Sequence, residues 1–146
     1  MATRSNIAIQ NEDGTVQSVY CHWDGYLEHN GKLLLKHYNT EETIKELISN
    51  GSLSSLGERI NPIGDLHDFD NKEEGTTVFY ARDRGESVVV SRFDNINQWT
   101  KNIEEYGYIW MKGQWHFISN SIYTGKSGLK KLTPKDCKEK SYTEKY

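Results

Sequence analysis

Hydrophobic and polar residues follow two different periods along this chain, and these periods predict its elements. Alternation with a period of two is typical of a half-buried strand. It predicts strands over residues 5–10, 15–23, 76–82, 86–93, 106–111 and 114–118. Asp13-Gly14 forms a hairpin turn after the first strand, and Lys112-Gly113 joins the last two strands into the clearest hairpin. We expect residues 76–82 and 86–93 to be antiparallel neighbours.

Two other segments carry apolar residues at helical spacing. The first helix begins with a cap at Asn39 or Thr40 and ends at Gly51, and the second is capped by Asp94 or Asn95. Their apolar stripes consist of Ile44, Leu47 and Ile48 in the first helix and Ile96, Trp99 and Ile103 in the second. These are the two helices that the pattern supports.

Three segments have no decisive period. Residues 31–38 fit either a strand or a short helix, and residues 52–75 form a long connection of the kind that is often functional or mobile. Residues 125–146 are lysine-rich, and 130–146 are expected to be a frayed tail or a helix docked on a partner. Hairpin signals outnumber crossover helices, so we expect one α+β domain over residues 1–146, with an antiparallel sheet core and two segregated helices.

Composition narrows the class of protein. Mean hydropathy is −0.80 and 27% of residues are charged, but four Trp, nine Tyr and four Phe argue against disorder. Marginal apolar content with many aromatics predicts that part of the core is intermolecular, in a homodimer or larger assembly. No apolar run reaches membrane-spanning length and no hydrophobic region follows Met1, so we expect a cytosolic protein that binds no membrane. Cys21 and Cys137 are isolated thiols, which predicts neither a disulfide framework nor a zinc site.

Charge is unevenly distributed. Residues 1–86 hold 8 Lys and Arg against 15 Asp and Glu, whereas residues 87–146 hold 10 against 6. A surface that binds long DNA or RNA needs a stronger basic excess than this. Recognition of phosphate must therefore be local, which favours a small anionic ligand over long nucleic acid.

Residues 78–86 hold the most informative candidate site. Phe79 and Tyr80 end a predicted strand, and Arg82 and Arg84 follow in a polar segment that contains a glycine. Aromatic faces stack on bases, and guanidinium groups bind phosphate oxygens in a bidentate way. A structural interpretation stays open beside this one, with one of the rings in the core and the arginines in a solvated turn with local ion pairs.

Other candidates are weaker. Trp23 begins an unusual Trp-Asp-Gly-Tyr turn, which suits either molecular recognition or a core position at a strand end. Cys21 and His22 are adjacent in a predicted strand and point to opposite faces, so they cannot form a catalytic pair. The segment from His67 to Asp70 resembles part of a metal site, but no ligand spacing fixes its geometry. Glycine fingerprints for phosphate are missing as well, so we expect no enzyme, no cofactor and no metal.

Five segments of the chain resemble small bacteriophage proteins. They are Ser5-Asn6-Ile7-Ala8-Ile9, Tyr20-Cys21-His22-Trp23-Asp24-Gly25-Tyr26, Glu28-His29-Asn30-Gly31, Leu53-Ser54-Ser55-Leu56-Gly57 and Phe79-Tyr80-Ala81-Arg82-Asp83-Arg84-Gly85. Over most of residues 5–118 the chain resembles the first family of Thoeris anti-defence proteins. The resemblance fades in the C-terminal tail.

The resemblance implies a sponge in the cytoplasm of the infected bacterium. Proteins of this family capture the cyclic ADP-ribose isomers made by host TIR-domain enzymes and do not degrade them. They are dimers, some assemble into hexamers, their nucleotide pockets lie between protomers, and some also take cyclic trinucleotides at separate sites. The adenine-stacking aromatic of the family falls on Tyr80, and its basic residues correspond loosely to Arg59 and Lys112. The full set of expected ligand-binding residues is Tyr80, Arg82, Arg84, Phe79, Arg59, Asn95, Lys112 and Trp23.

Two function hypotheses of different classes follow. Stoichiometric sequestration needs affinity and slow release rather than an acid–base pair, which agrees with the residues. The alternative is a phage protein that blocks a host enzyme by protein–protein contact through an acidic surface. That surface would consist of the helix with Glu41, Glu42 and Glu46 together with residues 65–70.

Overall fold

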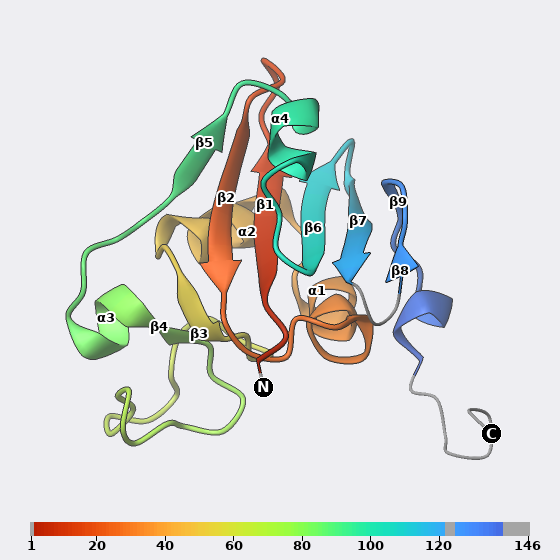
Figure 1. Cartoon of the computed structure of the whole chain (residues 1–146). Helices are drawn as coiled ribbons and strands as arrows, with labels where there is room; N and C mark the ends of the chain where they lie inside the picture. The colour runs from red at the N-terminus through yellow and green to blue at the C-terminus, as the bar shows by residue number, and fades with distance from the viewer. Residues whose placement is uncertain (1, 122–124, 139–146) are drawn as a thin grey trace.

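A computed structural model of the protein describes residues 2–121 and 125–138, which form a mixed α+β fold (Figure 1). The strands are β1 (Ser5–Gln10), β2 (Val16–Cys21), β3 (Leu53–Ser55), β4 (Val78–Phe79), β5 (Ser91–Phe93), β6 (Tyr106–Met111), β7 (Gln114–Ser121), β8 (Gly125–Lys126) and β9 (Lys130–Lys131). The helices are η1 (Leu27–Gly31), α1 (Lys32–His37), α2 (Glu41–Ser49), α3 (Tyr80–Arg84), α4 (Ile96–Thr100) and η2 (Pro134–Cys137).

The strands form one mixed sheet in the order β4-β3-β2-β1-β6-β7-β8, with β5 also paired to β2 and β9 to β7. The hairpins β1–β2 and β6–β7 are antiparallel, as expected. The expectation of an antiparallel sheet is wrong at two joins, because β1 pairs in parallel with β6 and β2 with β3. Both joins connect strands that are distant in sequence, so no turn between them sets the direction of the strands.

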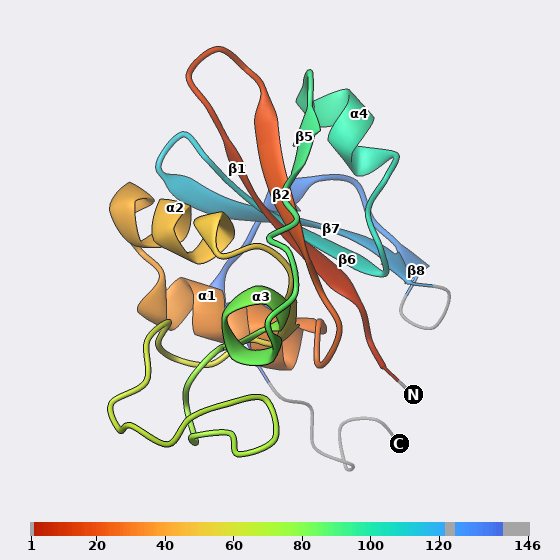
Figure 2. The same cartoon turned by 90° about the vertical axis from the view of Figure 1, so that its left-hand side faces the viewer.

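The central strand β1 is buried on both faces. Ile7 and Ile9 pack in the larger core cluster with Leu34 of α1 and Leu47 of α2. Ala8 points to the opposite face and packs in a second cluster with Trp99 of α4. Figure 2 shows α1 and α2 on one side of the sheet and α4 on the other. The helices therefore cover the two faces of the sheet separately.

Local signals predicted several element boundaries correctly. Thr40 caps α2 by accepting a hydrogen bond from the Thr43 N–H at 3.2 Å, and Asn95 caps α4 through the Gln98 N–H at 2.9 Å. The undecided segment 31–38 contains the short helix α1. The expected number of helices is too low, since the described residues contain four α-helices.

The predicted strand pair over residues 76–82 and 86–93 is wrong. The first strand stops at Phe79 and α3 follows, while β5 begins only at Ser91 and pairs with β2 instead of β4. Asp83 causes the change, because its carboxylate accepts the Phe79 N–H at 2.8 Å and so stabilises a helical turn. Gly85 then ends this turn in the left-handed conformation, with φ of 78°.

The lysine-rich C-terminal segment is ordered as far as it is described. Residues 125–138 form β8, β9 and η2, and Leu132 and Cys137 are buried. A capping box joins Thr133 and Asp136 at the start of η2. The expectation of a frayed tail or a docked helix is therefore wrong for residues 130–138, and its remaining part, 139–146, lies outside the described residues. No helix in the described residues is both long enough and apolar enough to span a membrane.

Candidate functional site

Tyr80 belongs to a surface cluster of aromatic rings and cations, Phe69, Lys72, Tyr80 and Arg84, which we call the Tyr80 cluster. The centres of the Tyr80 and Phe69 rings are 5.8 Å apart, with their planes at 33°. The guanidinium carbon of Arg84 lies 4.8 Å from the centre of the Tyr80 ring and 4.5 Å from that of Phe69. The Lys72 ammonium is 5.2 Å from the centre of the Phe69 ring. The cluster thus combines stacking surface with positive charge.

Backbone hydrogen bonds hold the two rings of the cluster in place. The Tyr80 N–H donates to the Ser52 carbonyl at 3.2 Å, which anchors the start of α3 beside β3. The Phe69 N–H donates to the carbonyl of Asp83 at 3.2 Å, which ties the long 56–77 connection to the same helix. The alignment of Phe69 with Tyr80 therefore depends on a contact between segments that are separate in sequence.

Arg84 is the accessible arginine of α3. Its side chain is 48% exposed, and one edge of the guanidinium group pairs with the Glu86 carboxylate. The centre of the group lies over the rings of Tyr80 and Phe69. An anion that binds here has to compete with Glu86 for this guanidinium.

Arg82 holds the fold together, in contrast to its expected role as a phosphate clamp. Its guanidinium donates to the carbonyl of Ile60 at 2.7 Å and to that of Thr77 at 2.8 Å. Its Nε–H and a second Nη2–H donate to the Asp83 carboxylate at 2.9 and 3.0 Å. Within the described residues, these bonds use four of the five N–H groups of the guanidinium group. Arg82 therefore has little capacity left to bind a phosphate.

His67 and Asp83 form an almost completely buried pair beneath this arginine. His67 Nε2 and Asp83 Oδ2 are 3.2 Å apart, and the two side chains are 1% and 4% exposed. His67 Nδ1 accepts the Glu73 N–H at 2.9 Å, so the ring proton is on Nε2 and is donated to Asp83. Both ring nitrogens are occupied, so His67 positions the loop and has no lone pair free to act as a base.

Two carboxylates of this region are held in their charged form. Burial acts to raise the pKa of Asp83, but hydrogen bonds from Arg82, Phe79 and His67 outweigh burial and keep the pKa below its ordinary value of 3.8. The Glu73 carboxylate accepts from the Thr76 hydroxyl and from two backbone N–H groups, which lowers its pKa to about 2.

Arg59 is engaged with the same loop. Its Nη2 lies 3.1 Å from a Glu73 oxygen and donates to the Glu74 carbonyl at 2.6 Å. Its Nε is buried and has no partner within the described residues. Like Arg82, Arg59 spends most of its hydrogen-bonding capacity inside the chain.

The other expected ligand residues have different positions. Phe79 is fully buried in the core, which contradicts its expected contact with a ligand. Trp23 is 43% exposed, beside the His22 ring at 4.7 Å, so of its two interpretations the core position is wrong. Asn95 uses its side chain to cap α4, and Lys112 occupies the β6–β7 turn with φ of 54°.

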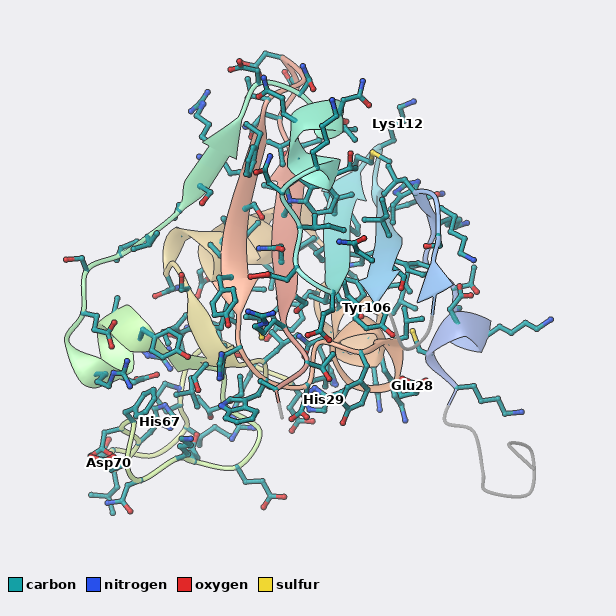
Figure 3. All side chains as sticks on the ribbon, in the orientation of Figure 1. Glu28, His29, His67, Asp70, Tyr106 and Lys112 are labelled. Carbon is teal, nitrogen blue, oxygen red and sulfur yellow. The ribbon has the colours of Figure 1, made fainter. Side chains whose placement is uncertain are left out.

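The expected ligand residues do not form one site within a single chain. Tyr80 lies near the Cys21 end of β2. Its neighbour Phe79 pairs with Leu53 of β3, and Leu53 pairs with Cys21. Lys112 and Asn95 lie toward the Val16 end of β2, roughly 17 Å away along that strand. Figure 3 shows Lys112 at the opposite end of the molecule from His67.

The thiol and imidazole candidates lack catalytic geometry. Cys21 is buried, and burial raises the pKa of its thiol to about 11. His22 Nδ1 lies 2.7 Å from the Tyr20 hydroxyl, so it is paired with a phenol and not with a thiol. No group of three or more His, Cys, Asp or Glu residues that could hold a metal ion occurs in the part of the chain that the structure describes.

Sequence reasoning missed Phe69 and Lys72. Both lie in the 52–75 connection, whose most obvious sequence feature is its acidic residues. The available signal was a single aromatic ring between Asp68 and Asp70, an unusual position for an apolar residue in a polar loop.

Comparisons of the chain with protein-family models, with curated proteins and with solved structures found no match.

Proposed function

We propose that this protein is a bacteriophage anti-defence sponge that binds and sequesters cyclic ADP-ribose isomers in the cytoplasm of the host without cleaving them. The Tyr80 cluster carries the proposal. The guanidinium group of Arg84 lies 4.8 Å from the centre of the Tyr80 ring. Both residues belong to the segment Phe79–Gly85, which resembles the Thoeris anti-defence family. An adenine base would stack on Tyr80, and Arg84 would bind the pyrophosphate.

The strength of binding required argues for a second protomer. Stacking on Tyr80 contributes about 1–3 kcal/mol, and charge-assisted hydrogen bonds contribute about 1.5–3 kcal/mol each. Nanomolar capture needs about 12 kcal/mol. Arg82 and Arg59 are occupied inside the chain, so one copy of the cluster falls short of this sum.

An exposed apolar segment beside the cluster supports a homodimer. Val88 and Val89 are each 56% exposed and Val90 is 36% exposed, in the stretch that follows α3. Contiguous exposed apolar residues mark interaction surfaces. A second copy packed on Val88–Val90 would close the site near Tyr80. Lys112 and Asn95, which are far from Tyr80 within one chain, would join the pocket only from that copy. Some members of the Thoeris anti-defence family, which the chain resembles, form hexamers. Such an assembly would offer separate sites for cyclic trinucleotides.

Sequestration without cleavage suits the chemistry around Tyr80. Of the acid–base groups of this region, His67 and Asp83 are buried and paired with each other, and the Glu86 carboxylate pairs with Arg84. A test is to incubate the protein with a cyclic ADP-ribose isomer, denature it and identify the released molecule by chromatography. We expect stoichiometric recovery of the same isomer. Linear ADP-ribose in excess of one equivalent per protomer would show turnover and contradict the proposal.

The alternative function is inhibition of a host enzyme through an acidic surface, and the acidic residues that it requires are exposed. Glu41 and Glu42 of α2 are exposed, as are Asp65 and Asp70, and the Asn61 amide donates to Glu46 of α2 at 3.0 Å. This hydrogen bond joins the start of the 56–77 connection to α2. Inhibition of a host enzyme through this surface predicts that Glu41→Gln/Glu42→Gln abolishes anti-defence activity while Tyr80→Ala preserves it. Sequestration predicts the reverse.

A further inference from the structure

A groove between α1 and η2 lies apart from the Tyr80 cluster. Figure 1 shows η2 beside α1, at the edge of the molecule opposite α3. The groove has a volume of about 720 Å³, within the range of small-molecule sites. It is lined by Lys32, Leu35, Lys36, Pro134, Lys135, Cys137 and Lys138.

Four lysines, which we call the groove lysines, stand on its two walls. Lys32 and Lys36 are one turn apart on α1, Lys135 belongs to η2, and Lys138 directly follows its last residue. Like charges at this spacing repel each other. Within the described residues no carboxylate lies within 4 Å of any of the four ammonium groups. The groove therefore concentrates positive charge for which the described part of the chain provides no carboxylate within 4 Å.

The acidic groups near the groove do not neutralise it. The Asp136 carboxylate accepts both the N–H and the hydroxyl of Thr133, at 2.9 and 2.7 Å, and so is used in capping η2. Glu28 lies close enough to Cys137 to act on its thiol, but it forms no close ion pair with a groove lysine in the described residues. An anion from outside the chain would complete the charge balance.

The apolar residues that line the groove, which we call its floor, include no aromatic ring. They are Leu35, Pro134 and the buried Cys137. A Cβ atom on Gly31 would lie 3.1 Å from Cys137 Sγ, so the glycine allows η2 to pack closely against the start of α1. Burial raises the pKa of the Cys137 thiol to about 11, although the positive charge of Lys32 acts to lower it. The floor offers van der Waals contact for an aliphatic chain and no surface for stacking a base.

We propose that this groove binds a free single-chain aliphatic anion, an alkyl phosphate or carboxylate. The groove lysines hold its head group and Leu35, Pro134 and Cys137 contact its chain. Lysine ammonium groups act as point charges without the planar fork of arginine, so they suit a head group held by charge more than by directed bidentate bonds. The site is independent of the proposed nucleotide pocket.

Titration calorimetry with decyl phosphate below its micellar concentration tests the proposal. We expect saturable binding, affinity at least about tenfold weaker for hexyl phosphate, which lacks four methylene groups, and far weaker binding of decanol and of inorganic phosphate. Lys32→Gln/Lys135→Gln should weaken decyl phosphate binding at least tenfold. Lys101→Gln/Lys131→Gln, which removes the same charge from exposed positions outside the groove, should change it less than twofold. Tyr80→Ala should bind decyl phosphate like the wild type.

Each contrary result would overturn the proposal. Equal losses of affinity for decyl phosphate in the two double variants would show that binding depends on overall charge and not on the groove lysines. Inorganic phosphate that binds as tightly as decyl phosphate would remove the role of the apolar floor. Binding to phosphatidylglycerol vesicles but not to phosphatidylcholine vesicles, without any binding of soluble decyl phosphate, would assign the lysines to a membrane surface instead.

Discussion

Arg82 and Arg84 lie on the same short helix, yet their guanidinium groups face different parts of the molecule. Arg82 donates to the carbonyls of Ile60 and Thr77, and so fastens the 56–77 connection to α3. Arg84 lies 4.8 Å from the centre of the Tyr80 ring and is 48% exposed. Of these two arginines, Arg82 therefore stabilises the fold, and Arg84 is available for contacts at the surface.

Substitution of each arginine by glutamine should separate the two roles. Arg82→Gln is expected to lower the free energy of unfolding by about 2–3 kcal/mol, because it removes several hydrogen bonds worth about 1 kcal/mol each. Arg84→Gln should lower it by less than about 1 kcal/mol and should weaken binding of a cyclic ADP-ribose isomer about tenfold. Urea unfolding and calorimetry measure these effects. Equal loss of stability in the two variants would contradict the assignment of Arg82.

Acid should destabilise the protein through Glu73. Its pKa falls from 4.5 to about 2 on folding, because the folded chain donates hydrogen bonds to the charged carboxylate. A group with a lowered folded-state pKa stabilises the fold above its unfolded pKa and loses that effect as pH falls through the folded value. The free energy of unfolding should therefore decrease between about pH 5 and pH 2, and Asp83 adds to this decrease with the same sign.

Urea unfolding at a series of pH values checks this expectation. Glu73→Gln should flatten the acid limb of the stability curve. Glu74→Gln, at the exposed neighbouring residue, should leave its slope unchanged. An identical slope in wild type and Glu73→Gln would show that this carboxylate does not stabilise the folded loop.

Tyr80 should contribute its ring face to binding and little to stability. Tyr80→Ala is expected to weaken binding of a cyclic ADP-ribose isomer at least tenfold, since it removes a stacking contact worth more than about 1.4 kcal/mol. Tyr80→Phe keeps the face and should bind within threefold of the wild type. Calorimetry with both variants measures this, and unchanged affinity in Tyr80→Ala would make the tyrosine a bystander.

The proposed assembly has a direct test in the valine segment. Light scattering at micromolar concentration should give the mass of a homodimer or a larger oligomer. Val89→Lys should shift the protein toward monomer, because it places a charge in an apolar contact. Asn97→Lys, an added charge on the exposed side of α4, should not. A monomeric wild-type protein would remove the pocket between protomers.

Much of the sequence prediction succeeded where the signal was local. The β1–β2 hairpin follows from the Asp13-Gly14 turn, where Gly14 has φ of 88°, and the β6–β7 hairpin follows from Lys112-Gly113. Caps and apolar spacing likewise predicted α2 and α4. The sequence also singled out the segment with Tyr80 and Arg84, because aromatic and guanidinium groups in close succession are visible without a structure, and the two side chains are in contact. Ligand binding at this segment stays a prediction.

The sequence by itself determined these turns, caps and local periods, since each depends on residues within a few positions of one another. Only the tertiary structure decided the parallel joins of the sheet, the position of Tyr80 beside Phe69 and the different contacts of Arg82 and Arg84. Those outcomes depend on partners supplied by distant segments, such as the carbonyl of Ser52 for Tyr80 and that of Ile60 for Arg82. A carbonyl is present at every position of the chain, so no residue type announces which one will be the partner.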